Sequence, residues 1–355
     1  MTESHILKHR DAHIHVARLD QGKWNVSVEA LDKNFYIHQR TCETSYPIDL
    51  IQKILDITGP AFLCDEILRD ESPDYVQNFL HYDLLSYLDE EEFKNKTLLD
   101  FGCGSGASTM ILTRMFPDTT IMGVESEERL LGVARARADY YGCRNLELLA
   151  SPGRDDLPTE ARDFDFVVLR GVYEHLLPEE RKRLLPRIWE VLNPGGILFI
   201  NQTPNRVFPI ELHTTGGLPF INFLPDAVAH KYAQYFSKRD YRQASWEQML
   251  RMGIRGGSVR EVFRNLKTCF PEPILLEPSR FGTTDRLDLS HLKYKNIGNP
   301  RMSQYFHLAA KALKLLTGIV LLPHLSLAIK KSRPGEIPSP VIESDIGLCP
   351  ARGAG

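Results

Sequence analysis

Residues 98–109 read Leu-Leu-Asp-Phe-Gly-Cys-Gly-Ser-Gly-Ala-Ser-Thr, and this stretch decides the fold of the chain. An apolar strand end leads to Asp100, and glycines follow at the alternate positions 102, 104 and 106, before a run that can begin a helix. Alternate glycines remove Cβ atoms where a ligand lies against the backbone, and they permit positive φ in a turn. The first N–H groups of a helix are available to a polar or anionic ligand. The stretch therefore predicts a nucleotide-type binding loop in a strand-turn-helix unit.

The glycine pattern alone does not identify the ligand. It also fits the G-x-G-x-x-G/A fingerprint of dinucleotide-binding proteins, with Gly102, Gly104 and Ala107 in the three small-residue places. Residues 120–124, Thr-Ile-Met-Gly-Val, read as a second apolar strand, which ends at Glu125. A carboxylate about 20 residues beyond the glycines can accept hydrogen bonds from ribose hydroxyls. Both candidate classes of protein use such a carboxylate.

The sequence after Glu125 separates the two classes. An apolar strand at 164–169 is followed by Tyr173-Glu-His-Leu-Leu177, a helix, Asn193-Pro-Gly-Gly196 and a strand at 197–200. The order and spacing of these elements resemble the class I S-adenosylmethionine (SAM)-dependent methyltransferases, especially their small-molecule branch. The resemblance covers about residues 96–204, and the segments 208–214 and 218–220 resemble a bacterial subgroup of the family.

The resemblance implies an α/β fold with a Rossmann-like, doubly wound sheet of seven mostly parallel strands, the last of them antiparallel. The alternation of strand and helix independently favours a parallel sheet covered on both faces. We predict four parts along the chain. These are an N-terminal region and helical cover (1–95), the methyltransferase domain with a cap inserted at about 205–250 (96–300), an apolar segment with basic flanks (301–333) and a disordered tail (334–355).

Two patterns refine the N-terminal prediction. Residues 12–17 and 24–28 alternate apolar and polar side chains around Gln21-Gly22, which is typical of a β-hairpin. Residues 47–92 show helical spacing of apolar side chains and are strongly acidic from Asp65 onward. Two roles fit the acidic helices: a cover over the cofactor and the substrate, as the resemblance implies, or an ordinary solvated face.

Composition limits the function classes. The 355 residues carry a net charge of −3, which gives no support to nucleic-acid binding. The six cysteines are scattered without a C-x-x-C pair, and no basic-then-apolar leader begins the sequence, so we expect a cytoplasmic protein. No Cys or carboxylate pattern completes a ligand set around the histidines at 5, 9, 13 and 15, and we predict no metal site.

The segment Leu315–Ile329 contains no Lys, Arg, Asp or Glu, and basic residues flank it. Its fifteen residues are too few to span a bilayer. Three roles fit the segment. It can lie in the interface of an anionic membrane, with 311–333 as a peripheral contact at the inner face, dock on its own domain, or join subunits of a homo-oligomer.

The resemblance assigns cofactor roles to twelve residues. Asp100 and the backbone of Gly102, Cys103, Gly104, Ser105 and Gly106 would hold the amino-acid end of SAM. Glu125, followed by Ser126, would hold the ribose, and Arg170 and Gly171 would line the methionine portion. In many relatives an Asp in the next loop contacts the adenine, but Gly153 occupies that place here, so Ser151 or Asp155 would have to substitute.

Methyl transfer to oxygen usually also needs a base that removes the acceptor proton. His175 follows the fourth strand, next to the expected methyl group, and His213 lies in the cap beside Glu211, which could orient its imidazole. Tyr173 and Glu174 are weaker candidates. The predicted function is SAM-dependent O-methylation of a small or lipid-linked acceptor. The alternatives are a nicotinamide-dependent oxidoreductase and a non-catalytic scaffold with the SAM-binding fold.

Overall fold

The fold was analysed in a computed structural model that describes residues 3–295, 297–333 and 335–336. Contacts divide the chain into two compact units. The first unit contains residues 1–81 and 103–150, and the second contains 82–102 and 151–355. The predicted tail, 334–355, lies outside the described residues apart from 335 and 336.

A four-stranded antiparallel sheet begins the first unit. Its strands follow the chain in the order β1 (Ser4–His9), β2 (Ala12–Arg18), β3 (Trp24–Ala30) and β4 (Thr41–Thr44). The predicted hairpin is confirmed, since β2 pairs with β3 in the register Ala12 to Ala30. The N-terminal cover is therefore a sheet with helices rather than helices alone. The short strands β1 and β4 were missed by the sequence interpretation.

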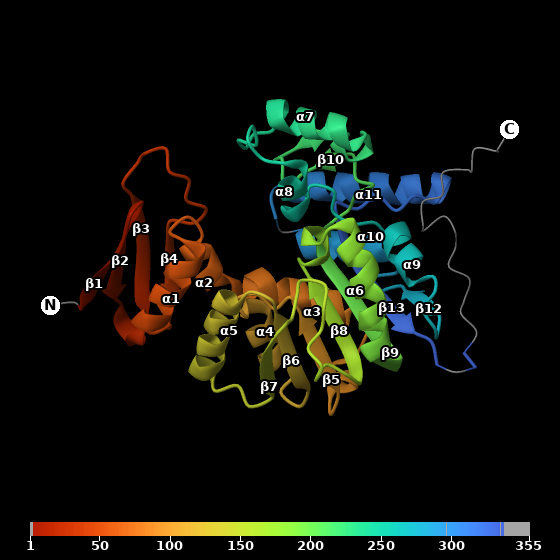
Figure 1. The fold of residues 1–355 in the computed structure, drawn as a ribbon, viewed down its shortest axis with the longest axis horizontal. Helices are drawn as coiled ribbons and strands as arrows, with labels where there is room; N and C mark the ends of the chain where they lie inside the picture. The colour runs from red at the N-terminus through yellow and green to blue at the C-terminus, as the bar shows by residue number, and fades with distance from the viewer. Residues whose placement is uncertain (1–2, 296, 334, 337–355) are drawn as a thin grey trace. The chain divides into compact units, whose positions relative to one another are not determined.

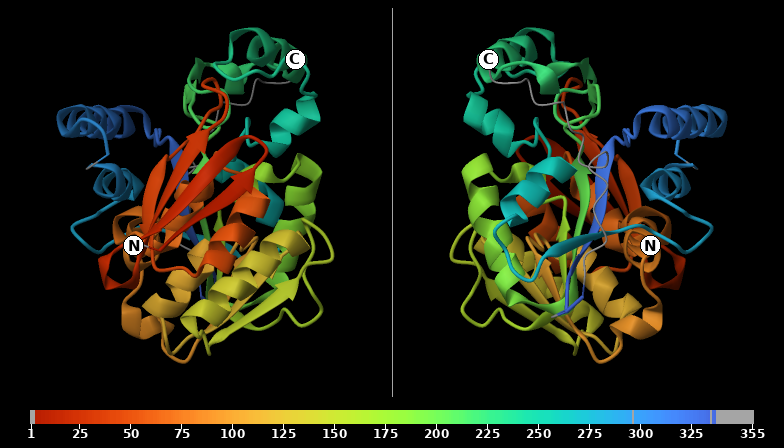
Figure 2. Two further views of the ribbon diagram at one scale, coloured as in Figure 1. Left: turned by 90° about the vertical axis from the view of Figure 1, so that its left-hand side faces the viewer. Right: turned by 90° about the vertical axis from the view of Figure 1, so that its right-hand side faces the viewer.

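Helices α1 (Ile48–Thr58) and α2 (Leu63–Glu71) complete a core with this sheet. Alternation places Ile14 and Val16 of β2 on the buried face, while His13 and His15 are exposed. The apolar stripes of α1 and α2 share the same core with Val133 of helix α5 (Glu128–Tyr141). Figures 1 and 2 show the four strands as one twisted sheet with α1 beside it.

The strand order of the large sheet is β12-β13-β9-β8-β5-β6-β7, and it confirms the predicted doubly wound arrangement. Only β13 is antiparallel to its neighbours β9 and β12 among the pairings described. The order reverses beside β5, and β5 pairs in parallel with β8. Open α/β sheets bind ligands at the carboxyl ends of the strands where the order reverses. The bounds are β5 Thr97–Phe101, β6 Thr120–Glu125, β7 Leu146–Ala150, β8 Phe164–Arg170, β9 Leu192–Pro204, β12 Pro273–Leu276 and β13 His324–Lys331.

The helices follow the strands as the alternating pattern predicts. In the first unit, α4 (Ala107–Met115) follows the glycine loop and packs beside α5. In the second unit, α6 (Pro178–Val191) and α9 (Val259–Leu266) lie side by side, as Figure 1 shows. The remaining helices include α3 (Asn78–Leu85), α10 (Arg286–Tyr294) and α11 (Pro300–Thr317).

The Asn193–Gly196 segment differs from the predicted turn before a separate strand. It lies within β9, where the pairing with β8 shifts register between Phe164 and Phe166. A Cβ atom on Gly196 would lie 2.8 Å from the Asp165 carbonyl oxygen, so only glycine permits this approach of the two backbones. The motif is therefore a bulge-like irregularity inside one long strand.

The predicted cap is an ordered insertion with its own small core. It contains β10 (Ile210–Glu211) paired with β11 (Leu218–Pro219), and the helices α7 (Asp226–Phe236) and α8 (Trp246–Arg251). Apolar side chains from these elements cluster together, among them Leu218, Ala229, Tyr241 and Met249. Backbone hydrogen bonds join Gly257 to Pro204 and Arg206, so the insertion runs from 205 to 257 rather than to about 250.

The apolar segment at 315–329 is not one interfacial element. Its second half is β13, whose residues 325–329 are buried between β9 and β12. Three of the basic side chains that flank the segment form ion pairs. Lys311 and Lys314 pair with Asp285, and Lys330 pairs with Glu336. Lys331 is buried and donates to the Leu192 carbonyl oxygen at 2.7 Å. Docking on its own domain, one of the three roles considered for the segment, therefore accounts for its second half, while apolar residues of α11 and Ile319 are exposed.

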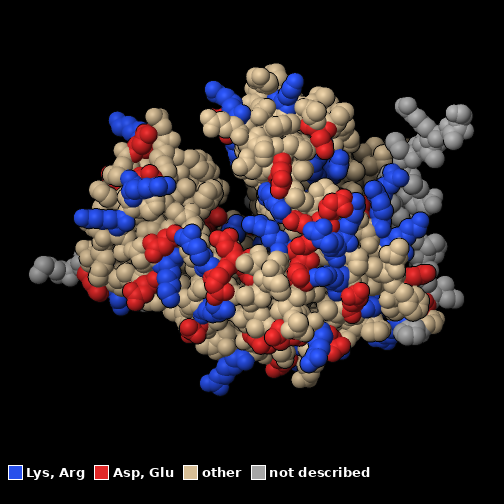
Figure 3. Space-filling view, in the orientation of Figure 1, with Lys and Arg blue, Asp and Glu red and all other residues tan. Residues whose placement is uncertain are grey.

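No helix among the described residues combines the length and the hydropathy needed to cross a membrane. The space-filling view in Figure 3 shows Lys and Arg interspersed with Asp and Glu over the visible face. This distribution agrees with the small net charge and forms no single-sign patch on that face.

Candidate active site

The glycine loop has the backbone that the sequence predicts. Gly102, Gly104 and Gly106 all adopt positive φ, at 73°, 57° and 83°. A Cβ atom on Gly102 would lie 2.6 Å from the side chain of Val172, and one on Gly106 would lie 2.9 Å from the Ala134 backbone. A Cβ on Gly104 would meet nothing within 4 Å. Two glycines therefore permit close packing, and the central one leaves open space above the loop.

Glu125 lies against the middle of this loop. One carboxylate oxygen accepts the Gly104 N–H at 3.0 Å, and the other accepts the backbone N–H groups of Ser126 and Glu127 at 2.7 and 2.9 Å. Ser126 does not cap α5, since Glu127 is the residue before the helix. The hydrogen bonds fix the Glu125 carboxylate at the carboxyl end of β6. A ribose there would meet a preoriented acceptor, which is the role that the resemblance implies.

The prediction for Ser105 concerned its backbone, and the structure shows that its side chain and its carbonyl oxygen are hydrogen-bonded inside the protein. The buried Arg137 of α5 donates to the Ser105 carbonyl and hydroxyl oxygens, both at 2.8 Å. Arg137 also donates to the Glu66 carboxylate at 2.9 Å, and the Ser105 hydroxyl donates to the same carboxylate. Glu66 belongs to α2, so a buried ion pair ties the N-terminal cover to the glycine loop. The acidic cover helix is therefore partly buried against the loop rather than simply solvated.

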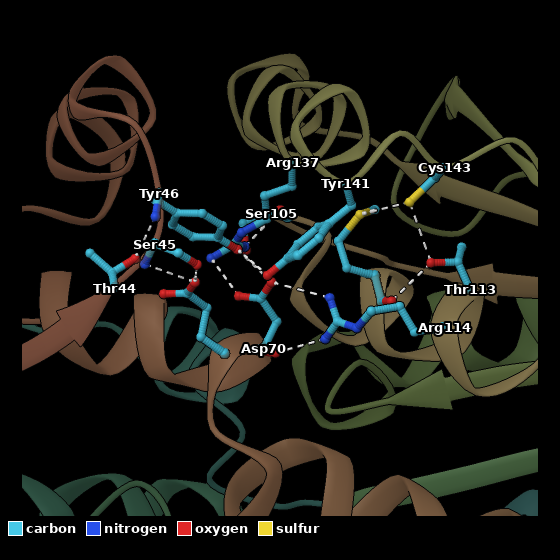
Figure 4. Close-up of polar contacts among 12 residues, drawn as sticks. Thr44, Ser45, Tyr46, Asp70, Ser105, Thr113, Arg114, Arg137, Tyr141 and Cys143 are labelled. Carbon is cyan, nitrogen blue, oxygen red and sulfur yellow. Dashed lines mark hydrogen bonds and ion pairs between the residues drawn. The ribbon is translucent and has the colours of Figure 1, made fainter. Parts of the chain in front are cut away.

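Asp70 extends this network (Figure 4). It lies 3.6 Å from Arg137 and accepts the Tyr46 hydroxyl at 2.5 Å, while the Arg114 guanidinium donates to its backbone carbonyl. Burial raises the pKa of Asp70 in spite of the nearby Arg137 charge. Burial would also raise the pKa of Glu66, but the Arg137 and Arg69 charges outweigh it and lower that pKa. Glu66 is therefore the firmly ionised partner of Arg137.

The two candidates for the adenine contact are engaged elsewhere. The Ser151 hydroxyl contacts the carbonyl oxygens of Gly153 and Asp156 at 2.8 and 2.6 Å, which closes its own loop. The Asp155 carboxylate accepts a hydrogen bond from Arg183 at 2.5 Å. Neither side chain is held ready for a ligand, so these two assignments gain no support from the structure.

The remaining cofactor candidates lie at the carboxyl ends of β5 and β8. Asp100 is buried in β5, where its backbone is in register with Val168 of β8. Gly171 has φ 65° and donates its N–H to the Asn201 carbonyl at 3.0 Å, directly after Arg170. These residues therefore lie at the carboxyl ends of β5 and β8, next to the point at which the strand order reverses.

The structure brings three of the four predicted catalytic residues together in the second unit. Glu174 and His175 follow β8, and His213 comes from the cap. One potential ligand atom from each of the three lies within 4.8 Å of the others, although the sequence predicted no metal site. The ring centroids of His175 and His213 are 5.9 Å apart. Burial lowers the pKa of His213, against the opposing effect of the Glu174 charge, which favours a neutral imidazole.

Two details of the predicted base are corrected. Glu211 does not orient the His213 imidazole, because its carboxylate accepts the backbone N–H groups of residues 213–215. The imidazole is held by Thr214, whose hydroxyl oxygen lies 3.2 Å from Nδ1. Tyr173 is fully buried, burial raises its pKa, and the Arg181 guanidinium covers its ring at 4.7 Å. Tyr173 is therefore a packing residue.

Several polar residues around this cluster were missed by the sequence analysis. Thr203 donates its hydroxyl to Glu174 at 2.9 Å, and His324 begins β13 in register with Pro204. Burial, reinforced by the Lys293 charge, lowers the pKa of His324 from 6.5 to about 4. Lys293, whose charge acts on His324, forms a buried ion pair with Asp83. No local sequence motif identifies these residues, because the contacts that bring them to the site are made with residues distant in the sequence.

Comparison with known proteins identifies the domain. Residues 98–196 match the family described as a methyltransferase domain. A ubiquinone biosynthesis O-methyltransferase from Coxiella burnetii is 29% identical over 167 residues, which cover 45% of this chain and 65% of the relative. A carboxy-S-adenosyl-L-methionine synthase from Pectobacterium atrosepticum is 28% identical over 150 residues, 40% of this chain and 60% of that enzyme. A solved SAM-dependent methyltransferase from Methanosarcina mazei is 23% identical, with a TM-score of 0.30 and coverage of 35% of this chain and 57% of that one.

The chain spans less than two thirds of the length of these two curated relatives. The matched residues run from the middle of β5 to the irregularity in β9, so they contain the glycine loop, Glu125 and the Glu174-His175 pair. The match favours the methyltransferase interpretation of the glycine loop over the dinucleotide-binding one. The chain therefore carries a class I SAM-dependent methyltransferase domain.

Proposed function

We propose that the whole chain is a SAM-dependent methyltransferase that acts on an oxygen atom of a small or lipid-linked acceptor. The observation that carries the proposal is the glycine loop, in which Gly104 faces open space and its N–H fixes the Glu125 carboxylate. The loop backbone would hold the amino-acid end of SAM, and Glu125 would bind the ribose hydroxyls. SAM supplies an activated methyl group, so the protein mainly aligns donor and acceptor.

The polar groups after β8 support oxygen as the methyl acceptor. A neutral imidazole can take the proton that an alcohol or phenol loses as the new bond forms. His175 and His213 carry the imidazoles that lie beside Glu174 in the described structure. The Coxiella relative is named an O-methyltransferase, which points the same way. The assignment of a lipid-linked acceptor rests on the name of that relative and on the apolar helix described next.

Helix α11 supplies the reason to retain a lipid-linked acceptor, a peripheral membrane contact or a homo-oligomer. Its exposed apolar residues include Met302, Tyr305, Leu308, Leu315 and Leu316. Since Lys311 and Lys314 are paired with acidic residues, membrane contact would be apolar in origin and insensitive to salt. Sedimentation of the full chain with liposomes in low and high salt tests this contact. Association of the chain with itself instead would assign the helix to an oligomer interface.

The proposed activity is tested by offering the purified chain SAM that carries an isotopic label on its methyl group. We expect SAM to bind, and we expect the label to pass to an acceptor in a cell extract. The labelled product is then identified by mass spectrometry. Binding of SAM without any transfer would favour the non-catalytic scaffold. Retention of a nicotinamide cofactor without SAM binding would contradict the proposal.

A further inference from the structure

We infer that Glu174, His175 and His213 form a binding site for one divalent transition-metal ion, of which Zn²⁺ is the representative case. Two histidines and one carboxylate are a common ligand set of catalytic zinc ions and of other first-row metals. The three potential ligand atoms already lie within 4.8 Å of one another. Ligands about 2.0–2.2 Å from one ion lie somewhat closer together than this, so side-chain movements of about 1 Å would complete the site.

The hydrogen bonds of His175 leave the correct nitrogen available. Its Nδ1 lies 2.8 Å from the Arg251 carbonyl oxygen, which can only accept, so Nδ1 carries the proton. The neutral ring therefore has its lone pair on Nε2, the atom that faces Glu174 at 3.9 Å. Metal-binding histidines typically donate their other N–H to a carbonyl or carboxylate in this way.

His213 is oriented by the same logic through one more residue. The Thr214 hydroxyl donates its single proton to the Met252 carbonyl oxygen at 2.9 Å. Its oxygen must then accept from Nδ1 of His213, 3.2 Å away, which places the lone pair of His213 on Nε2. Arg251 and Met252 are consecutive residues at the end of α8, so one turn of the cap orients both imidazoles. Gly253 follows, and a Cβ there would lie 3.1 Å from both Glu174 and His213.

The burial and the partners of Glu174 are a second, independent observation in favour of a metal ion. Its side chain is 2% exposed, yet the salt bridges of the described residues give it no Lys or Arg partner. Thr203 donates to one oxygen, at 2.9 Å, while the other faces His175. Glu211 nearby is equally buried but accepts hydrogen bonds from residues 213–215. Buried charges are normally paired or bound to a metal, and among the salt bridges of the described residues Glu174 has only the His175 imidazole, 3.9 Å away, as a partner.

The site deepens the proposed function and rests on it for its chemical role. An imidazole that binds the ion through its lone pair cannot also take the acceptor's proton, so in the metal-bound protein the ion replaces the imidazoles as the group that activates the acceptor. An acceptor hydroxyl that occupies an open position on the ion becomes more acidic and releases its proton to water. The oxygen lone pair then forms the bond to the methyl carbon. The sulfur–methyl bond breaks, and its electron pair stays on sulfur as the neutral thioether of S-adenosylhomocysteine.

Metal binding is measured without SAM or acceptor, on the full chain after dialysis against a chelator. Calorimetric titration with Zn²⁺ should show one ion per chain, and Co²⁺ should give visible absorption bands of a nitrogen- and oxygen-ligated ion. Glu174→Gln and His213→Ala should each weaken Zn²⁺ binding at least tenfold. The matched control is His230→Ala in the same cap, since the His230 ring bonds the Ala244 carbonyl instead, and it should leave binding unchanged.

A second variant guards against loss of folding. Thr214→Val keeps all three ligands but removes the group that orients His213, and such outer partners typically contribute 10–100-fold to metal affinity. Equal Zn²⁺ affinity in wild type, Glu174→Gln and Thr214→Val would overturn the site. Failure of wild type to bind Zn²⁺ or Co²⁺ while it still binds SAM would overturn this inference alone. Metal binding without SAM binding would leave the site in place and contradict the proposed methyl transfer.

Discussion

The glycine loop and the Glu174-His175-His213 cluster use polar side chains in opposite ways. Around the loop, Glu66, Ser105 and Arg137 satisfy one another in the interior, and they hold the loop in a shape that leaves open space at Gly104. In the cluster, each imidazole is fixed at Nδ1, and Nε2 of His175 faces Glu174. The first arrangement maintains a shape, whereas the second holds groups that can exchange protons or bind an ion. This contrast predicts that substitutions in the first region mainly reduce stability and that substitutions in the second mainly reduce turnover.

The largest expected effect is on catalysis. His213→Ala or His175→Ala should lower turnover by about 10²- to 10⁴-fold, the usual contribution of a positioned proton-transfer group. SAM affinity should stay unchanged, because neither histidine belongs to the glycine loop. Steady-state rates and calorimetric SAM titrations on each variant check both statements. If both variants keep near-normal rates, the cluster is structural and the contrast fails.

The next effect is on stability. Arg137→Met removes the buried cation between Glu66 and Asp70, so that only the partly exposed Arg69 and Arg114 stay near these carboxylates. Removal of one partner from a buried ion pair typically costs about 3–5 kcal/mol. Arg135→Met on the same helix breaks only an exposed pair with Glu128 and should cost less than about 1 kcal/mol. Urea unfolding of the two variants measures the difference in the free energy of unfolding. Equal losses would show that the buried network adds nothing specific.

A smaller effect concerns the free energy of unfolding at acidic pH. Burial lowers the pKa of His324 from 6.5 to about 4, so between these pH values the folded chain binds fewer protons than the unfolded chain. Stability from this residue is therefore present above about pH 6.5 and decreases as the pH falls toward 4, by about 2 kcal/mol at pH 5. His324→Gln lacks the titrating group and should lose correspondingly less stability on acidification. Unfolding free energies at pH 7 and pH 5 for both proteins test the sign, and parallel losses would contradict it.

The smallest effect concerns the cofactor itself. Glu125→Ala should weaken SAM binding by about tenfold, since one charge-assisted hydrogen bond contributes about 1.5–3 kcal/mol and water partly replaces it. Glu127→Ala, two residues further on, changes an exposed side chain and should have no effect. Calorimetric titration with SAM provides the affinities. Unchanged affinity in a folded Glu125→Ala protein would mean that the ribose does not bind there.

The parts of the fold that follow from local rules were predictable. The glycine loop, the strand that ends at Glu125 and the helix that begins at Pro178 depend on residues close in sequence. The segment 324–331 was not assigned to the sheet, because a short apolar run suits a buried strand and an interfacial segment equally well. Its neighbours settle the matter, since β9 and β12 cover both of its edges.

The candidate site, like the fold, was predictable from the sequence only in part. Glu174, His175 and His213 were singled out because they follow a strand end or lie in the cap. The orientation of the two imidazoles was not predictable. His175 depends on the Arg251 carbonyl, 76 residues away, and His213 depends on Thr214, which is held by the Met252 carbonyl, 38 residues from Thr214. Arg137 was overlooked since an arginine on a helix normally faces water, and its partner Glu66 is 71 residues distant.

The closure of the cap at its base has a consequence for what insertions this fold can accept. The chain leaves the sheet after Pro204 and returns at Gly257, where Gly257 donates its N–H to the Pro204 carbonyl at 2.9 Å. Because entrance and exit are adjacent, an insertion of another length or sequence can leave the ends where they are, and the entropy of closing a longer loop rises only slowly. The cap supplies His213 and the carbonyl groups that orient both imidazoles. Because its two ends are adjacent, the whole insertion could be replaced by another without moving the sheet. Under the proposed function, replacement of this one segment would change the groups that surround Glu174 and leave the glycine loop and its sheet as they are.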